Sequence, residues 1–150
     1  MLVTIETASI EHLDWLCEIE VKCFGREAFT RQQIYHLLAD PDSVGLVSRL
    51  KGEIVGFVIG KICMDRKTAV GHISTIDVLS EHRRGGIGQM LLQGVEKTFK
   101  DKGVATCFLE ARENNTAALS LYQKFGYKRI ETLEKYYGDA HGIRLRKALT

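Results

Sequence analysis

A glycine-rich turn joins a strand-like segment to an amphipathic helix in the middle of the chain. The turn HRRGGIG, residues 82–88, follows an alternating segment that ends near Leu79. From Gly86 onward, apolar residues recur every four positions, at Ile87, Leu91, Val95 and Phe99. This spacing predicts a helix with one apolar face. The first N–H groups of such a helix lack partners within it, so the turn is a candidate anion-binding site.

The residues of the turn leave two interpretations open. Glycines allow the backbone to approach a phosphate closely, and Arg83 and Arg84 add positive charge. The alternative is an ordinary strand-to-helix turn whose arginines are solvated. The chain has no GxxxxGK[ST] motif, and no GxGxxG opens an early strand–helix–strand unit. These absences argue against nucleotide hydrolysis and dinucleotide binding.

Apolar periodicity predicts an alternating series of strands and helices along the chain. Helices are expected at residues 9–24, 30–38, 86–103 and 116–125. Strands are expected at residues 2–6, 44–50, 54–64, 70–79, 107–111, 127–137 and 143–148. The second, third and fourth of these strands should be antiparallel neighbours. We therefore predict one α/β domain, residues 1–150, with a mixed, mostly antiparallel central sheet and helices on both faces.

Composition excludes several classes of protein. Lys plus Arg is 21 and Asp plus Glu is 19, so the net charge of +2 does not indicate nucleic-acid binding. No apolar run approaches the roughly 18 residues of a membrane-spanning helix, and the N-terminus lacks a signal-peptide pattern. We therefore expect a soluble, cytoplasmic protein. The four cysteines form no CxxC motif and are expected to be buried apolar residues: Cys17, Cys23, Cys63 and Cys107.

Three segments resemble one enzyme family. The pattern Arg83-x-x-Gly86-x-Gly88 after the strand-like ISTIDVL resembles the acetyl-coenzyme A signature of the GNAT superfamily of N-acetyltransferases. The segment FLEARENNTAALSLYQKFGY, residues 108–127, is similar to the superfamily's next segment. KYYGDAHGIRLRKAL, residues 135–149, is similar to the end of protein N-terminal acetyltransferases of the RimI type and their archaeal and eukaryotic relatives. The resemblance covers roughly residues 70–150.

The resemblance implies acetyl-coenzyme A as cosubstrate and no metal. Residues expected to bind the cosubstrate are Ile76, Asp77, Val78, Arg83, Arg84, Gly85, Gly86, Ile87, Gly88, Gln89, Asn115 and Tyr122. The backbone N–H near Val78 is expected to face the thioester oxygen. For Asn115, an N-cap of the following helix is the alternative role.

The resemblance also implies the catalytic groups. Glu110 matches the base that takes the proton of the amine, and Tyr122 matches the acid that protonates the leaving thiolate. An edge carboxylate in solvent and a core tyrosine are the alternatives. Strand periodicity predicts that residues 72, 74, 76 and 78 share one face that looks into the substrate groove. His72 on that face is expected to have a supporting role or to be a buried structural histidine.

Two segments are expected to bind the acceptor. Tyr136 and Tyr137 form one wall, and Phe24, Gly25, Arg26 and Glu27 form the other. The family's implied activity is acetyl transfer to the α-amino group of a protein or peptide N-terminus by direct attack in a ternary complex. Ribosomal proteins or nascent chains are among the implied acceptors, with no direct nucleic-acid or membrane binding and a monomer or weak homodimer. Acetylation of lysine or a small amine, and a non-catalytic coenzyme A-binding module, are the alternatives.

Overall fold

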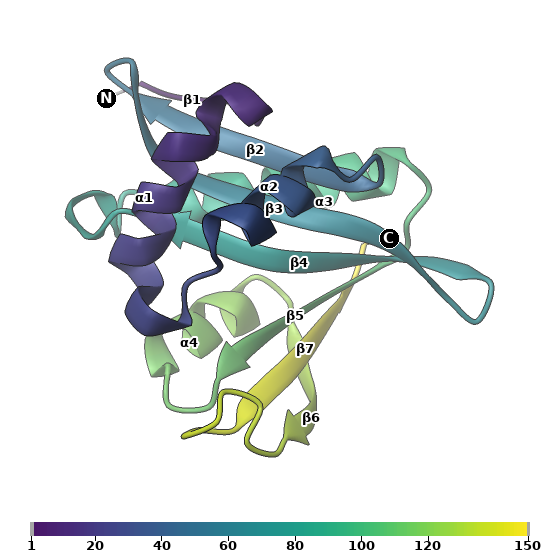
Figure 1. Ribbon diagram of the computed structural model, residues 1–150. Helices are drawn as coiled ribbons and strands as arrows, with labels where there is room; N and C mark the ends of the chain where they lie inside the picture. The colour runs from purple at the N-terminus through teal and green to yellow at the C-terminus, as the bar shows by residue number, and fades with distance from the viewer. Residues whose placement is uncertain (1, 150) are drawn as a thin grey trace.

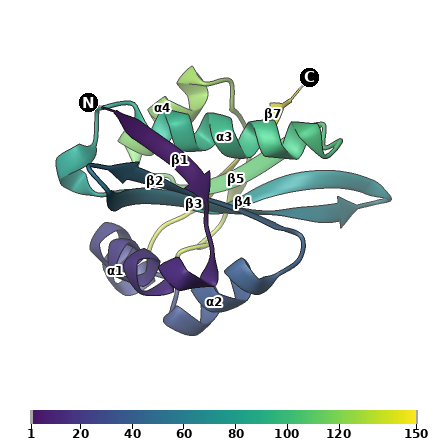
Figure 2. The same ribbon diagram turned by 90° about the horizontal axis from the view of Figure 1, so that it is seen from above.

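The computed structural model describes residues 2–149 as one seven-stranded sheet with helices on both of its faces (Figures 1 and 2). The elements are β1 (Val3–Thr7), α1 (Leu13–Phe24), α2 (Arg31–Ala39), β2 (Ser43–Leu50), β3 (Glu53–Asp65), β4 (Thr68–Val78), α3 (Ile87–Asp101), β5 (Thr106–Arg112), α4 (Thr116–Lys124), β6 (Lys128–Leu133) and β7 (Gly142–Ala148). The strand order is β1-β2-β3-β4-β5-β7-β6, and only β4 and β5 pair in parallel. The predicted fold class is confirmed, and β2, β3 and β4 are antiparallel neighbours as expected.

Local sequence signals explain most element boundaries, but one predicted strand and the predicted burial of the cysteines need correction. Thr30 and Gln33 form the predicted capping box of α2, because each accepts a hydrogen bond from the backbone N–H of the other. The expected strand over residues 127–137 was too long. β6 ends at Leu133, and Tyr136 and Tyr137 lie in the β6–β7 loop, residues 134–141, which includes Lys135 at a φ of 49°. Of the cysteines expected to be buried, only Cys107 is; the other three are partly exposed.

Two apolar layers hold the helices to the sheet. α1 and α2 cover one face, where Leu16 and Ile34 of these helices join Phe57 of β3 in one apolar cluster, while α3 and α4 cover the other face (Figure 2). The buried ring of Phe99 on α3 packs directly on the sheet backbone. A Cβ on Gly71 of β4 would lie 2.6 Å from Phe99 Cδ2, and one on Gly60 of β3 would lie 2.7 Å from its Cζ. These glycines therefore set how closely α3 approaches the sheet. Within residues 2–149, no helix is both long and apolar enough to span a membrane.

We predict that Gly71→Ala destabilises the protein by about 1–3 kcal/mol, because the added methyl group overpacks the Phe99 ring. Urea unfolding measures the difference. Gly85→Ala is the control, since a Cβ there would meet only the His82 carbonyl, at 3.7 Å, and should change stability by less than about 0.5 kcal/mol. Equal stability of Gly71→Ala and wild type would contradict the close packing of α3 on β4.

A buried pair of carboxyl groups lies between the sheet and α1. Thr75 Oγ1 on β4 is 2.9 Å from Glu20 Oε1 on α1 and 2.6 Å from Asp77 Oδ1. One hydroxyl hydrogen cannot serve both oxygens, so a carboxyl proton must supply one of these hydrogen bonds. Burial, followed by the charge of Glu20, raises the pKa of Asp77 well above its ordinary value. We infer that Asp77 carries this proton at neutral pH.

The raised pKa of Asp77 predicts how stability depends on pH. Between the unfolded-state pKa of about 3.9 and the raised folded-state pKa, only the folded protein holds this proton. The free energy of unfolding should therefore fall as the pH rises through that window. Asp77→Asn cannot ionise, so its stability relative to wild type should increase from pH 4 to pH 7 in urea unfolding series. The exposed Asp65→Asn is the control, and parallel curves for Asp77→Asn and wild type would refute the prediction.

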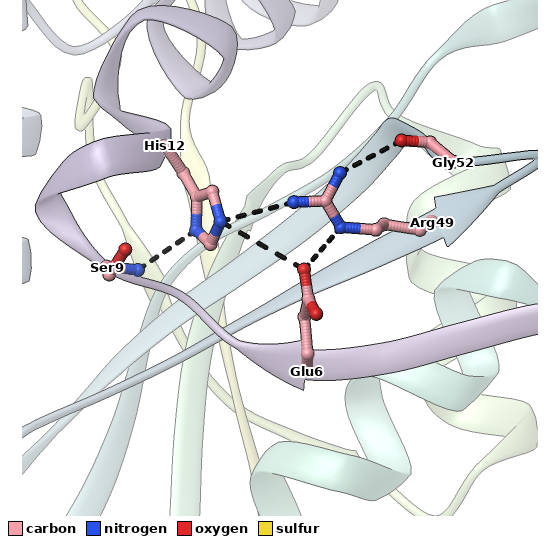
Figure 3. Close-up of polar contacts among 5 residues, drawn as sticks. All are labelled: Glu6, Ser9, His12, Arg49 and Gly52. Carbon is pink, nitrogen blue, oxygen red and sulfur yellow. Dashed lines mark hydrogen bonds and ion pairs between the residues drawn. The ribbon is translucent and has the colours of Figure 1, made fainter.

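Arg49 joins the edge of the sheet to the segment before α1 (Figure 3). Its guanidinium pairs with Glu6 of β1, and its Nη1 donates to the Gly52 carbonyl at 2.9 Å. His12 Nε2 lies 3.4 Å from Arg49 Nη2, and His12 Nδ1 accepts from the Ser9 N–H at 3.1 Å. This network is at the β1–β2 edge, at the opposite end of the strand order from β6 and β7 (Figure 1).

Candidate active site

The sheet opens between its two parallel strands. β4 pairs with β5 only at Gly71 and His72, after which the two strands diverge (Figure 1). The Leu79 N–H donates to the Val55 carbonyl on the β3 side. Because antiparallel strands alternate, the backbone groups of Ile76 and Val78 point the other way, into the opening. An extended ligand with amide groups can pair with this edge of β4.

A short 3₁₀ turn, Ser80–His82, joins the end of β4 to the glycine turn. Arg84 and Gly86 both have positive φ, at 68° and 83°, so the chain reverses sharply before α3 begins at Ile87. The Met90 N–H donates to the Gly86 carbonyl, which leaves the N–H groups of residues 87–89 without partners inside the helix. A Cβ on Gly86 would meet no atom within 4 Å, so the turn is open. This arrangement fits a phosphate group.

Two residues expected to bind the cosubstrate point elsewhere. Arg83 Nε donates to the Val78 carbonyl at 3.0 Å, and its Nη2 lies 3.7 Å from Cys23 Sγ on α1. The side chain of Asp77 is buried under α1. Its backbone N–H and carbonyl point toward β3, as those of Leu79 do two residues later. Arg84, which is exposed, remains the arginine available beside the turn.

The expectation that residues 72, 74, 76 and 78 share a face is wrong, because β4 contains a bulge. Ile59 of β3 pairs with Thr75 and Gly60 pairs with Ile73, so Ser74 is an extra residue in the ladder. One extra residue in a strand moves the side chains that precede it to the opposite face of the sheet. His72 therefore lies on the α1 side with Thr75 and Asp77, whereas Ile76 and Val78 pack toward the α3 side.

His72 and Glu110 form a close pair where β4 and β5 separate. His72 Nε2 is 2.6 Å from Glu110 Oε1, and Arg144 Nε of β7 donates to Glu110 Oε2 at 3.1 Å. Burial alone would raise the pKa of Glu110, but His72 and Arg144 together outweigh it and lower the pKa below the ordinary value. Glu110 is thus ionised at neutral pH. Its side chain is 7% exposed and that of His72 is 36% exposed, so His72 is the more accessible member.

The other expected site residues of α4 have clear structural settings. Tyr122 is buried and packs edge-on against Tyr127, with ring centroids 6.0 Å apart. Burial raises the pKa of Tyr122, so its phenol is protonated at neutral pH. Asn115 accepts a hydrogen bond from the Ala118 N–H at 3.1 Å and is the N-cap of α4, which was the alternative role.

The two predicted acceptor walls face each other at the end of β5. Phe24 ends α1, and Gly25, Arg26 and Glu27 form a single 3₁₀ turn after it. Across from this turn, Tyr136 and Tyr137 of the β6–β7 loop pack edge-on, with ring centroids 4.9 Å apart. Burial raises the pKa of Tyr137 to about 12, with further contributions from Tyr136 and Glu110.

Two arginines that the sequence analysis did not identify complete the site. Arg144 is directly opposite Glu110 in the β5–β7 register and also pairs with Glu131 of β6. Arg112, at the end of β5, pairs with both Glu27 and Asp139. Alternation along β5 would have put Glu110 and Arg112 on one face, but the partners of both arginines depend on contacts distant in sequence. Within residues 2–149, no group of three or more His, Cys, Asp or Glu side chains has metal-binding geometry.

Known proteins share this architecture. The Acetyltransferase (GNAT) family matches residues 8–127. An N-alpha-acetyltransferase of Sulfurisphaera tokodaii is 33% identical over 120 residues, which are 74% of this chain and 72% of the relative. The ribosomal-protein-S18-alanine N-acetyltransferase of Escherichia coli has the same fold, with a TM-score of 0.89 at 22% identity, over 99% of this chain and 95% of that chain. So does Arabidopsis thaliana NAA60 in complex with acetyl-CoA, with a TM-score of 0.87 at 18% identity over 98% of both chains. The chain therefore belongs to the GNAT family of acetyltransferases.

Proposed function

We propose that the protein transfers an acetyl group from acetyl-coenzyme A to the α-amino group of a protein or peptide N-terminus, by direct attack in a ternary complex. The observation that carries this proposal is the opening between β4 and β5, which brings a free strand edge next to the His72–Glu110 pair. The N-alpha-acetyltransferase name of the Sulfurisphaera relative supports the α-amino acceptor. We propose ribosomal proteins and nascent chains in the cytoplasm as acceptors, and the name of the Escherichia coli ribosomal-protein-S18-alanine N-acetyltransferase supports the first of these.

The free edge and the glycine turn fit the two parts of acetyl-coenzyme A. The edge of β4 at Ile76 and Val78 suits the amide-bearing arm, and the unpaired N–H groups of residues 87–89 suit the pyrophosphate. The cosubstrate supplies an activated thioester. In this arrangement the Val78 N–H stabilises the oxyanion that forms when the amine adds to that thioester. A preorganised donor of this kind is worth about 2.7–4 kcal/mol.

We assign removal of the proton from the amine to the His72–Glu110 pair rather than to Glu110 alone. An ionised carboxylate with a lowered pKa is a weak base. Because Glu110 Oε1 accepts the hydrogen bond at 2.6 Å, His72 Nε2 carries the hydrogen and Nδ1 is the basic nitrogen. His72 Nδ1 takes the proton from the attacking amine, and Glu110 stabilises the resulting imidazolium. Arg144 keeps Glu110 ionised in this role.

The leaving thiolate needs a proton donor, and Tyr122 suits it. Its raised pKa keeps the phenol protonated. Tyr122 also lies near the glycine turn, because a Cβ on Gly88 would be 3.9 Å from Leu121, the residue before Tyr122 on α4. The phenol proton passes to the thiolate sulfur as the C–S bond breaks. Protonated thiol then leaves instead of the more reactive thiolate.

We predict that α-amino groups are the preferred acceptors and that internal lysines are poor ones. In an unstructured peptide the α-amino group has a pKa of about 7.7–8.0 and the lysine side chain one of about 10.4, so the α-amino group is more often neutral at pH 7 to 8. The measurement is mass spectrometry of a peptide that contains both amines, with an N-terminally blocked copy as the control. Dominant lysine acetylation would instead support the alternative of a lysine acetyltransferase.

We predict that His72→Gln and Glu110→Gln each lower kcat by about 10²- to 10⁴-fold while acetyl-coenzyme A affinity stays near wild type. The double variant should be no slower than the slower single variant, because the two groups act as a unit. Higher pH should partly restore both single variants, since solution hydroxide then supplies neutral amine. Tyr122→Phe should also be slow, but alkali should not restore it.

Kinetics of these variants across pH distinguish the possible bases. A slow Glu110→Gln enzyme beside an unimpaired His72→Gln enzyme would assign the proton to Glu110 itself. Normal turnover and an unchanged pH profile in both variants would exclude the pair from the reaction.

A further inference from the structure

One arginine joins the two proposed walls of the acceptor site. Arg112 Nε donates to Glu27 Oε1 at 2.7 Å, and its Nη2 pairs with Glu27 Oε2 and with Asp139 Oδ1, the latter at 2.9 Å. Its Cζ lies 5.3 Å from the centre of the Tyr137 ring. We call this group of Arg112, Glu27, Asp139 and Tyr137 the Arg112 clasp. It is a fork-shaped contact with a carboxylate, reinforced by a second carboxylate and an aromatic face.

The clasp connects segments that are distant in sequence. Glu27 belongs to the 3₁₀ turn after α1, and Asp139 and Tyr137 belong to the β6–β7 loop. Arg112 is the last residue of β5 and is on the same face of that strand as Glu110. Arg112 therefore connects the two walls at the next position on the face of β5 that carries Glu110. Both carboxylate oxygens of Glu27 are bonded to Arg112.

The Arg112–Glu27 part of the clasp is less exposed than a typical surface ion pair, whereas the side chain of Asp139 is 76% exposed. The side chain of Arg112 is 23% exposed and that of Glu27 is 34% exposed. The hydrogen bonds of Glu27, then of Asp139, raise the pKa of Arg112, and Arg112 lowers the pKa of Asp139. The β6–β7 loop is also braced internally, since the Tyr137 N–H donates to the Ala140 carbonyl at 3.1 Å. The clasp therefore joins an internally bonded loop to the turn after α1.

We propose that Arg112 is a positioning residue for the acceptor, which holds the turn after α1 and the β6–β7 loop at the separation that encloses the first residues of the substrate. This inference rests on the proposed function, which identifies the two segments as acceptor walls. Without the clasp, the walls must be ordered when the acceptor binds, and that ordering reduces affinity. The chemical step is unaffected because Arg112 touches no reacting atom. Salt should weaken the clasp, since its charges are partly exposed.

Steady-state kinetics of Arg112→Met tests this role. The variant should raise KM for the acceptor peptide about three- to tenfold, the range expected for a partly exposed ion pair, with kcat changed by less than about twofold. KM for acetyl-coenzyme A should not change. Added salt should raise the acceptor KM of the wild type but hardly that of the variant. Arg112→Lys keeps the charge but cannot form the fork, and should be intermediate.

Two further variants separate the clasp from general effects of losing an ion pair. Arg49→Met removes the comparable Arg49–Glu6 pair at the far edge of the sheet and should leave the acceptor KM unchanged (Figure 3). The charge exchange Glu27→Arg with Arg112→Glu should restore part of the acceptor affinity. Calorimetry of acceptor peptide binding to the coenzyme A-bound proteins should give the same order of affinities.

The possible outcomes distinguish this inference from the proposed function. An unchanged acceptor KM in a folded Arg112→Met enzyme that acetylates α-amino groups would overturn the clasp alone. A fall in kcat with an unchanged acceptor KM would also overturn it. Acetylation of internal lysine by the wild type would overturn the proposed acceptor, while the KM for that peptide would still test the clasp. A wild type that neither binds nor acetylates either peptide would overturn both.

Discussion

The short pairing between β4 and β5 is the constraint on which the rest of the site depends. The ladder ends after His72, so the remaining length of β4 is bonded to β3 on one side only. Backbone groups in a protein interior need partners, and beyond His72 the β4–β5 ladder supplies none to this edge, although the Val78 carbonyl accepts a hydrogen bond from Arg83 Nε. α3 begins at Ile87, after the two turns that follow β4, and its first N–H groups add further donors without partners in the helix. The proposed binding surface is thus a product of the sheet's own geometry.

Two carboxyl groups on one face of this sheet have pKa values shifted in opposite directions by their neighbours. Glu110 lies between His72 and Arg144, so the charged form is favoured despite burial. Asp77 lies beside Glu20, so the charged form is disfavoured by both burial and a like charge. Position on the sheet thus separates a carboxylate suited to stabilising an imidazolium from a neutral group suited to packing. A difference of this kind is what allows acid and base functions to coexist at one pH.

Much of this architecture was predictable from local sequence, and the failures have identifiable physical causes. Period-two and helical patterns predicted the order of the elements, and capping residues such as Thr30 predicted a helix start. The bulge at Ser74 has no local signal, because it depends on how β4 aligns with β3. The partners of Arg112 and Arg144 depend on strand register and on a loop distant in sequence. Sequence therefore predicted the candidate groups but not their pairing, which decides their chemistry.

The free edge of β4 also links the folding of the protein to metabolism. A ligand that pairs with this edge and with the start of α3 binds the folded chain and has no comparable site on the unfolded one. Such a ligand at one hundred times its dissociation constant adds about 2.7 kcal/mol to the free energy of unfolding. The resistance of the protein to proteolysis would then rise and fall with the cellular supply of acetyl-coenzyme A.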